Sequence, residues 1–329
     1  MKKLTAFFFG MFLLVWRITI APAEAESLVL GYSGAGLSTD LRRVIEKEKI
    51  WQKHGLDVRS IYFNSGTLLA QAMVGGDIGV SDSDVPAQLN LKMAGILDVK
   101  AVAVTINRLE HYFVVRNPVK TAGDLKGKRI AISRYGSASD ITTRLVLRYW
   151  RLDPDKDVVM LQSGNTPTRI AALVVGYVDG ALVSPDHLHK ILASGCCRVL
   201  ADLSELPMDY ARFGIVVPTS MLKMQRETLR KLLESYVEGI HIFKTRPEVV
   251  LSVLKEEGIG DRQVAQEVYE RVARSLREFP VPEPKGIQAA LDSLTAAKVQ
   301  RARAEDFMDT SLMEEIKKSG FIDRLYGRR

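Results

Sequence analysis

The feature of this sequence that most constrains its fold is a pattern that occurs twice, 100 positions apart. Residues 64–84 read NSGTLLAQAMVGGDIGVSDSD, and residues 165–186 read NTPTRIAALVVGYVDGALVSPD. Each stretch predicts a polar helix start, a helix, a glycine turn and a short apolar strand, and at this offset Gly76 matches Gly176. Two copies of one helix–turn–strand unit predict two similar α/β lobes; a chance likeness between two ordinary α/β units is the alternative.

In both copies hydroxyl groups and backbone amides occur where a strand ends and a helix begins. Small ligands bind at these positions in open α/β sheets. The repeat therefore predicts a protein that holds a small molecule between two lobes.

Residues 1–25 have the pattern of a cleaved secretory signal. Two lysines give a basic start, an apolar stretch follows, and Ala23-Glu24-Ala25 fits the small-x-small cleavage rule. Arg17 interrupts the apolar run, which is short for a membrane span, so a retained anchor is only the alternative. No cysteine lies near the cut, and no lipid anchor is expected. We expect a mature protein that begins near Glu26 and is free in an extracytoplasmic space.

Charge and motifs argue against two other classes of protein. The formal charge of +7 is modest for 329 residues, and basic residues alternate with acids on predicted helices, so we expect no nucleic-acid partner. The chain has five histidines and two cysteines but no HExxH or CxxC motif, so we expect no metal and no cofactor.

The two cysteines, Cys196 and Cys197, are neighbours. Adjacent cysteines can pair only with strain, so we expect one side chain to point into the core and the other away from it. A vicinal disulfide is the alternative.

Strands and helices alternate over the first two thirds of the chain, which predicts βαβ units and mainly parallel sheets. The strand His111–Arg116 departs from this pattern and is expected to be antiparallel or a crossover. From Thr219 onward the pattern is nearly all helical. We predict a two-lobed α/β protein with residues 26–118 and 208–329 in the first lobe and residues 119–207 in the second.

Several short motifs occur in a fixed order: Gly31-Tyr32-Ser33, Lys53–Val58, Gly76-Asp77-Ile78, Thr121–Ile130, Gly136-Ser137, Arg169–Asp179 and Val216–Thr219. In this order they resemble the motifs of periplasmic solute-binding proteins of the nitrate/sulfonate/taurine ABC-transporter type, a group that also contains binders of thiamine-pyrimidine precursors. The resemblance covers essentially the whole mature chain.

The resemblance implies a type II periplasmic binding protein fold with two crossover segments, the ligand in the cleft, and C-terminal helices on the first lobe. It also implies a membrane ABC permease as the partner. In one departure, Gly79 stands where the second repeat has Asp179. The ligand groups of nitrate or taurine binders are therefore not carried over.

Loops at strand ends that face the predicted cleft supply the candidate ligand-binding residues. These are Ser33, Asn64, Ser65, Gly66, Thr67, Ser81, Asp82, Tyr135, Gly136, Ser137, Ser139, Asn165, Thr166 and Ser184. Their amides and hydroxyls can bind an anion, and Tyr135 offers a ring or a hydroxyl. Helix capping is the alternative role for the Ser, Thr and Asn residues. Candidate anion partners among the arginines are Arg134, Arg144 and Arg169.

The sequence gives less support to an enzymatic function. The stretch Gly31–Gly36 matches neither GxGxxG nor GxSxG. The rival on the same fold is an enzyme similar to thiamine-pyrimidine synthases, which are cytosolic and rich in cysteine at their site. The expected secretory signal favours a solute receptor instead. We predict a monomer with no catalytic residues that closes around a small anionic or heteroaromatic ligand and delivers it to the permease.

The predicted site can be tested by removing one hydroxyl from each lobe. We expect the double variant Ser65→Ala/Ser137→Ala to bind the ligand more weakly and to remain folded, because both hydroxyls are expected to contact the ligand. Calorimetric titration measures this effect. An unchanged affinity would reject the placement of the site.

Overall fold

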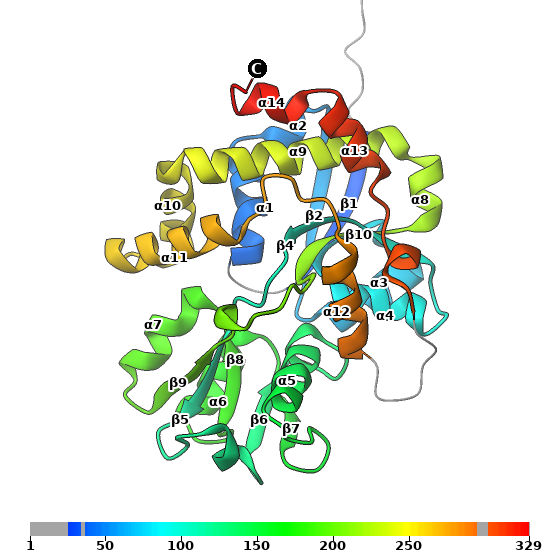
Figure 1. The fold of residues 1–329 in the computed structure, drawn as a ribbon. Helices are drawn as coiled ribbons and strands as arrows, with labels where there is room; N and C mark the ends of the chain where they lie inside the picture. Colours follow the sequence, from blue (N-terminus) through cyan, green and yellow to red (C-terminus); the bar gives the residue numbers. More distant parts are fainter. Residues whose placement is uncertain (1–25, 34–36, 295–301, 329) are drawn as a thin grey trace, which may run out of the picture.

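The computed structural model describes residues 26–33, 37–294 and 302–328. The predicted signal peptide, 1–25, lies outside the described residues. Two five-stranded sheets form the two lobes, one above the other in Figure 1. The first has the strand order β2-β1-β3-β10-β4 and the second the order β7-β6-β8-β5-β9. The predicted two-lobed α/β fold is confirmed.

The first sheet consists of β1 (Glu26–Ser33), β2 (Leu56–Phe63), β3 (Val80–Asp84), β4 (Val99–Ile106) and β10 (Phe213–Pro218). The second consists of β5 (Tyr112–Arg116), β6 (Arg129–Ile132), β7 (Val159–Gln162), β8 (Gly180–Val183) and β9 (Cys197–Asp202). The α-helices are α1 (Leu37–Lys47), α2 (Ile50–Lys53), α3 (Gly66–Gly75), α4 (Val85–Met93), α5 (Ala138–Tyr149), α6 (Thr166–Val174), α7 (Pro185–Ala193), α8 (Thr219–Met224), α9 (Arg226–Thr245), α10 (Pro247–Glu256), α11 (Arg262–Ser275), α12 (Pro284–Leu294), α13 (Ser311–Lys318) and α14 (Phe321–Leu325). Three short 3-10 helices are η1 (Ala122–Leu125), η2 (Leu203–Glu205) and η3 (Ala304–Phe307).

The repeat found in the sequence extends to the pairing of the strands. Leu30 lies opposite Val80 in the first sheet, and Ile130 lies opposite Gly180 in the second. The parallel pairs β1–β2 and β6–β7 keep the same offset, with Leu30 opposite Ser60 and Ile130 opposite Met160. The two lobes therefore share one register.

Each sheet is completed by an antiparallel strand that arrives from the other lobe. β5 follows β4 of the first sheet and inserts between β8 and β9. β10 follows β9 of the second sheet and inserts between β3 and β4. The crossovers are therefore residues 107–111 and 203–212. The prediction that placed residues 112–118 in the first lobe is wrong for β5, because this strand forms its ladder with the second sheet.

The helix of each repeat ends in the same turn. Gly76 and Gly176 have φ of 82° and 76°, a left-handed conformation that side chains with a Cβ atom disfavour. The N–H of Asp77 donates to the carbonyl of Ala72 (3.2 Å), and the N–H of Tyr177 donates to that of Ala172 (2.9 Å). These matched bonds lead into Ile78 and Val178, which are buried and lie two residues before β3 and β8.

The C-terminal helices pack mainly on the first lobe. In Figure 1, α9 runs across the end of the first sheet, with α10, α13 and α14 around it. Leu229, Leu232, Tyr236 and Ile240 of α9 belong to one buried cluster with β1 and α1. Two other helices reach the second lobe, because α11 contacts α7 and α12 contacts α5. Among the described residues, no helix combines the length and the apolar character needed to cross a membrane.

The first helix of the chain differs from its predicted form. The apolar spacing before the stop residue Gly55 predicts one helix from about Thr39 or Asp40 to His54, whereas the structure has α1 and α2 with a break at Lys49. Lys49 has a φ of 54°, so the chain leaves the right-handed helical region at this residue.

The matched glycine turns allow a comparison of two substitutions. We expect Gly76→Ala to reduce the free energy of unfolding by about 1 kcal/mol, because alanine disfavours positive φ and nothing lies within 4 Å of the added Cβ. Gly176→Ala should cost more, because its Cβ would lie 2.1 Å from Nη1 of Arg116, which donates to the carbonyl of Leu173. Urea unfolding measures both losses, and a smaller loss for Gly176→Ala would contradict this account.

Candidate functional site

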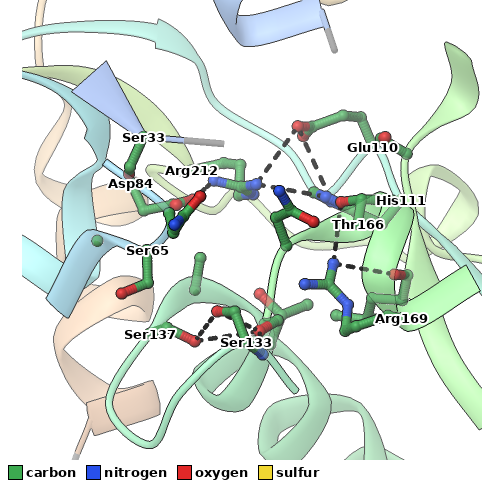
Figure 2. Close-up of a pocket in the computed structure, with 18 of the residues that line it drawn as sticks. Ser33, Ser65, Asp84, Glu110, His111, Ser133, Ser137, Thr166, Arg169 and Arg212 are labelled. Carbon is green, nitrogen blue, oxygen red and sulfur yellow. Dashed lines mark hydrogen bonds and ion pairs between the residues drawn. The ribbon is translucent and has the colours of Figure 1, made fainter. Parts of the chain in front are cut away.

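A cavity lies between the two sheets and is lined by residues of both (Figure 2). The space between the lining residues, its open mouth included, is about 690 Å³. Nine predicted site residues line it: Ser33, Asn64, Ser65, Gly66, Ser137, Ser139, Asn165, Thr166 and Ser184. Its lining is mostly polar; the apolar residues are Ala138, Leu182 and Pro185.

The strand ends and helix starts of both lobes bring these residues together. Ser33 ends β1, and Ser133 follows β6 at the equivalent position. Ser65 and Asn165 are the N-caps of α3 and α6. The Oγ of Ser65 accepts from the N–H of Leu68 (3.3 Å), and Oδ1 of Asn165 accepts from that of Thr168 (3.2 Å). Both residues therefore cap a helix and also line the cavity.

A cluster of three serine hydroxyls lies at the start of α5. The Oγ of Ser133 is 2.7 Å from that of Ser137 and 3.0 Å from that of Ser139. The N–H of Ser133 also donates to Oγ of Ser139 (2.7 Å). All three side chains are buried. The hydroxyl of the N-cap Ser137 is used inside this cluster and makes no cap bond to α5. Because the first residues of α5 line the cavity, the positive end of the α5 dipole lies at the cavity wall.

Arg169 of α6 is a buried cation at the cavity, with 4% of its surface exposed. Its Nη1 donates to the carbonyl of Gly164 (2.9 Å), and its Nη2 donates to Oγ1 of Thr166 (3.1 Å) and to the carbonyl of Leu182 (3.2 Å). Its Nε has no hydrogen-bond partner among the described residues. Burial lowers the pKa of Arg169 to about 10, which leaves the side chain charged at neutral pH. None of the ion pairs in the described part of the chain involves this arginine.

Arg212, at the end of the second crossover, lies among three titratable groups (Figure 2). It forms an ion pair with Asp84, and its Nη2 lies 3.8 Å from Oε1 of Glu110 and 3.5 Å from Nε2 of His111. All four residues line the cavity. Burial lowers the pKa of Arg212 to about 9 and raises that of Glu110 to about 8. At neutral pH, protonated Glu110 is therefore the favoured form, and Asp84 is the main counter-ion of Arg212.

His111 is neutral at this site. Burial, with a further contribution from the charge of Arg169, lowers its pKa to about 4. Since Asp84 offsets Arg212 and Glu110 is largely protonated, the cavity keeps the positive charge of Arg169 at neutral pH.

The other five predicted site residues do not line the cavity. Asp82 faces α9 and accepts a hydrogen bond from the hydroxyl of Tyr236 (2.6 Å), and burial raises its pKa to about 7. Ser81 is fully buried, 2.7 Å from the Oγ of Ser83. The exposed ring of Tyr135 turns outward, and its hydroxyl donates to the carbonyl of Met160 (3.0 Å).

Thr67 and Gly136 lie where the two lobes meet. Oγ1 of Thr67 donates to the carbonyl of Tyr135 (3.2 Å), which joins the start of α3 to the loop before α5. The N–H of Gly136 donates to Asp140 (2.8 Å). These residues connect the lobes outside the cavity lining.

Several cavity residues were not among the predicted site residues. Glu110, His111 and Arg212 belong to the crossovers, where the repeat has no counterpart in sequence. Ser133 could have been found, because it lies 100 positions after the predicted Ser33. Within the described part of the chain, no cluster of three or more His, Cys, Asp or Glu residues could hold a metal ion.

The two lobes, their exchanged strands and the cavity between them define the class: the protein has the periplasmic binding protein fold. A model of the family described as NMT1/THI5 like matches residues 45–249, more than half of the chain. The chain therefore belongs to this family.

Curated relatives match a part of the chain. A protein of Brucella abortus (strain 2308), described only as a candidate binding protein, is 28% identical over 163 residues. That alignment covers 50% of this chain and 49% of the relative, so the chain spans about half the length of the curated relatives it matches.

Two solved structures show the same fold at low identity. An alkanesulfonate-binding protein from Xanthomonas axonopodis pv. citri, bound to MOPS, has a TM-score of 0.70 at 18% identity and covers 82% of this chain and 91% of its own. The periplasmic nitrate-binding protein of Synechocystis PCC 6803 has a TM-score of 0.63 at 16% identity and covers 77% of this chain and 70% of its own. At these identities the likeness establishes the fold.

The raised pKa of Glu110 predicts a pH dependence of stability. Between its ordinary pKa of 4.5 and its folded value of about 8, the unfolded chain loses the proton while the folded chain keeps it. The free energy of unfolding of the wild type should therefore fall as pH rises from about 5 to about 8. Glu110→Gln cannot ionise at this position, so its free energy of unfolding should lack this decrease.

Urea unfolding of both proteins at several pH values across this window measures the difference. Glu305→Gln, at an exposed glutamate, is the control for loss of a carboxylate at the surface. If the difference between the wild type and Glu110→Gln stays constant with pH, Glu110 ionises normally in the folded state.

Proposed function

We propose that this protein is the extracytoplasmic solute-binding component of an ABC importer, and that its ligand is a small anion bound between the two lobes. The lobes close on the ligand, the closed form docks on a membrane permease, and the ligand is released there. The protein acts as a receptor in the periplasm and carries out no reaction.

The observation that carries this proposal is the charge of Arg169. Arg169 is buried and forms no ion pair among the described residues, and a bound anion would supply a counter-charge in a place shielded from water. The Ser133–Ser137–Ser139 cluster and the start of α5 add hydroxyl donors and the positive end of a helix dipole on the same side.

The two-lobed arrangement supports capture by closure. Both lobes contribute to the cavity, and two crossovers join them, so a rotation about residues 107–111 and 203–212 would open and close the site. The hydrogen bond from Thr67 to Tyr135 joins the lobes in the present structure and would break on opening.

The comparisons support a receptor over the enzyme that shares this fold. The solved neighbours cited above are described as binding proteins for an alkanesulfonate and for nitrate, and both of these ligands are anions.

The residues that line the cavity also bear on the kind of ligand. Its described residues include no Phe, Tyr or Trp, so stacking on a heteroaromatic ring has less support than binding of an anion.

The role of Arg169 can be tested with Arg169→Met. A thermal-shift screen of nitrate, ethanesulfonate, succinate and a neutral pyrimidine should first identify an anion that raises the melting temperature of the wild type. Because a hydrogen-bonded charge contributes about 1.5–3 kcal/mol, we expect the variant to bind that anion about 10–100-fold more weakly in calorimetry.

Arg144→Met is the matched control. Arg144 forms ion pairs with Asp140 (2.7 Å) and Asp155 (2.6 Å) and does not line the cavity, so its loss should leave the affinity unchanged. Arg169→Lys, which keeps the charge, should retain part of the affinity, and circular dichroism checks that each variant is folded. The proposal fails if Arg169→Met binds the anion as well as the wild type, or if only the neutral pyrimidine stabilises the protein.

A further inference from the structure

Cys196 and Cys197, the only cysteines of the chain, lie in contact at the turn between α7 and β9. Their Sγ atoms are 2.6 Å apart, and both residues are free thiols in the structure. The expectation that one side chain points into the core is confirmed for Cys197, but Cys196 does not point away from it, because it packs against the same buried cluster. Side chains alternate only within a strand, and Cys196 precedes the first residue of β9.

The surrounding turn is held by hydrogen bonds. The N–H of Asn117 donates to the carbonyl of Cys196 (3.0 Å), and its Nδ2 donates to the carbonyl of Gly195 (2.7 Å). Gly195 has a φ of 67°, and the Oγ of Ser194 lies 3.0 Å from Sγ of Cys196. Since Asn117 follows β5, the neighbouring strand of the sheet, the fold fixes the backbone that makes the sulfur atoms converge.

We propose that Cys196 and Cys197 form a two-electron redox site, which closes to a vicinal disulfide when the folded protein meets a disulfide oxidant. The favourable feature is the folded turn. In an unfolded chain, adjacent cysteines pair only with strain, whereas here the two sulfur atoms are already in contact.

The difference in burial sets the order of the steps. Cys196 is half-buried and accessible, whereas Cys197 is buried, and burial raises the pKa of its thiol to about 12. Cys196, as the thiolate, attacks one sulfur of the oxidant, forms a mixed disulfide and releases the first thiol of the oxidant. Cys197 then loses its proton and attacks Sγ of Cys196, which releases the second thiol. Two cysteine thiols are thus oxidised, and the disulfide oxidant is reduced to two thiols.

The cysteine pair lies outside the proposed ligand cavity. Neither cysteine lines the cavity, but α7 connects the two sites: Ser184 and Pro185 at its start line the cavity, and the cysteines follow its end. The new bond would therefore fix the C-terminal end of a helix whose first turn forms part of the cavity wall. It also lies beside β9, the edge strand of the second sheet.

The test uses the protein without residues 1–25, equilibrated with mixtures of reduced and oxidised glutathione, once folded and once unfolded in urea. Intact-mass measurement after acid quenching and alkylation counts the free thiols. We expect the folded protein to convert to a monomer that is lighter by about 2 Da and has no alkylated thiol. The unfolded chain should need a more oxidising mixture, because it lacks the folded turn.

Two serine variants identify the sulfur atoms. Cys197→Ser should form a mixed disulfide with glutathione at the accessible Cys196, Cys196→Ser should react more slowly, and neither should lose 2 Da. Two glutathione adducts on the wild type, a disulfide-linked dimer, or equal oxidation of folded and unfolded chains would overturn the proposal. The measurement uses no ligand, so its result is independent of the test on Arg169.

Discussion

The exchange of two strands between the lobes is the constraint on which the rest of this structure depends. β10 completes the first sheet and β5 completes the second, and each arrives from the opposite lobe. Buried backbone N–H and C=O groups must be paired, so neither strand can leave its sheet without exposing a ladder of unsatisfied groups. The chain therefore crosses between the lobes twice at fixed positions, and the last residues of both crossovers line the cavity.

The chemistry of the cavity follows from that arrangement. One crossover contributes Glu110 and His111, and the other contributes Arg212. Asp84, at the end of β3, offsets the charge of Arg212, while burial keeps Glu110 largely protonated and His111 neutral. Arg169, on the opposite repeat, keeps its charge without a carboxylate partner among the described residues. The proposed preference for an anion depends on this difference between two buried arginines.

Sequence patterns predicted the helix-cap residues of the site better than its charged residues. The repeat placed Ser65 and Asn165 at equivalent helix starts, and both cap a helix and line the cavity. Side-chain direction was less predictable. Asp82 lies on a strand whose next acidic residue, Asp84, reaches the cavity, yet Asp82 faces α9 and binds Tyr236. The hydrogen-bond partner of Asp82 is 154 positions away in the sequence, so no local sequence pattern predicts this contact.

The sequence by itself determined the two α/β units, their glycine turns and the polar residues at strand ends, because hydrophobic periodicity and positive-φ glycines act over a few neighbouring residues. The tertiary structure alone decided that β5 belongs to the second sheet, that the crossovers deliver Glu110, His111 and Arg212 to one place, and that Cys196 and Cys197 face each other. These outcomes depend on contacts between distant segments and on burial, which changes the charge of a group only after the whole chain has packed around it.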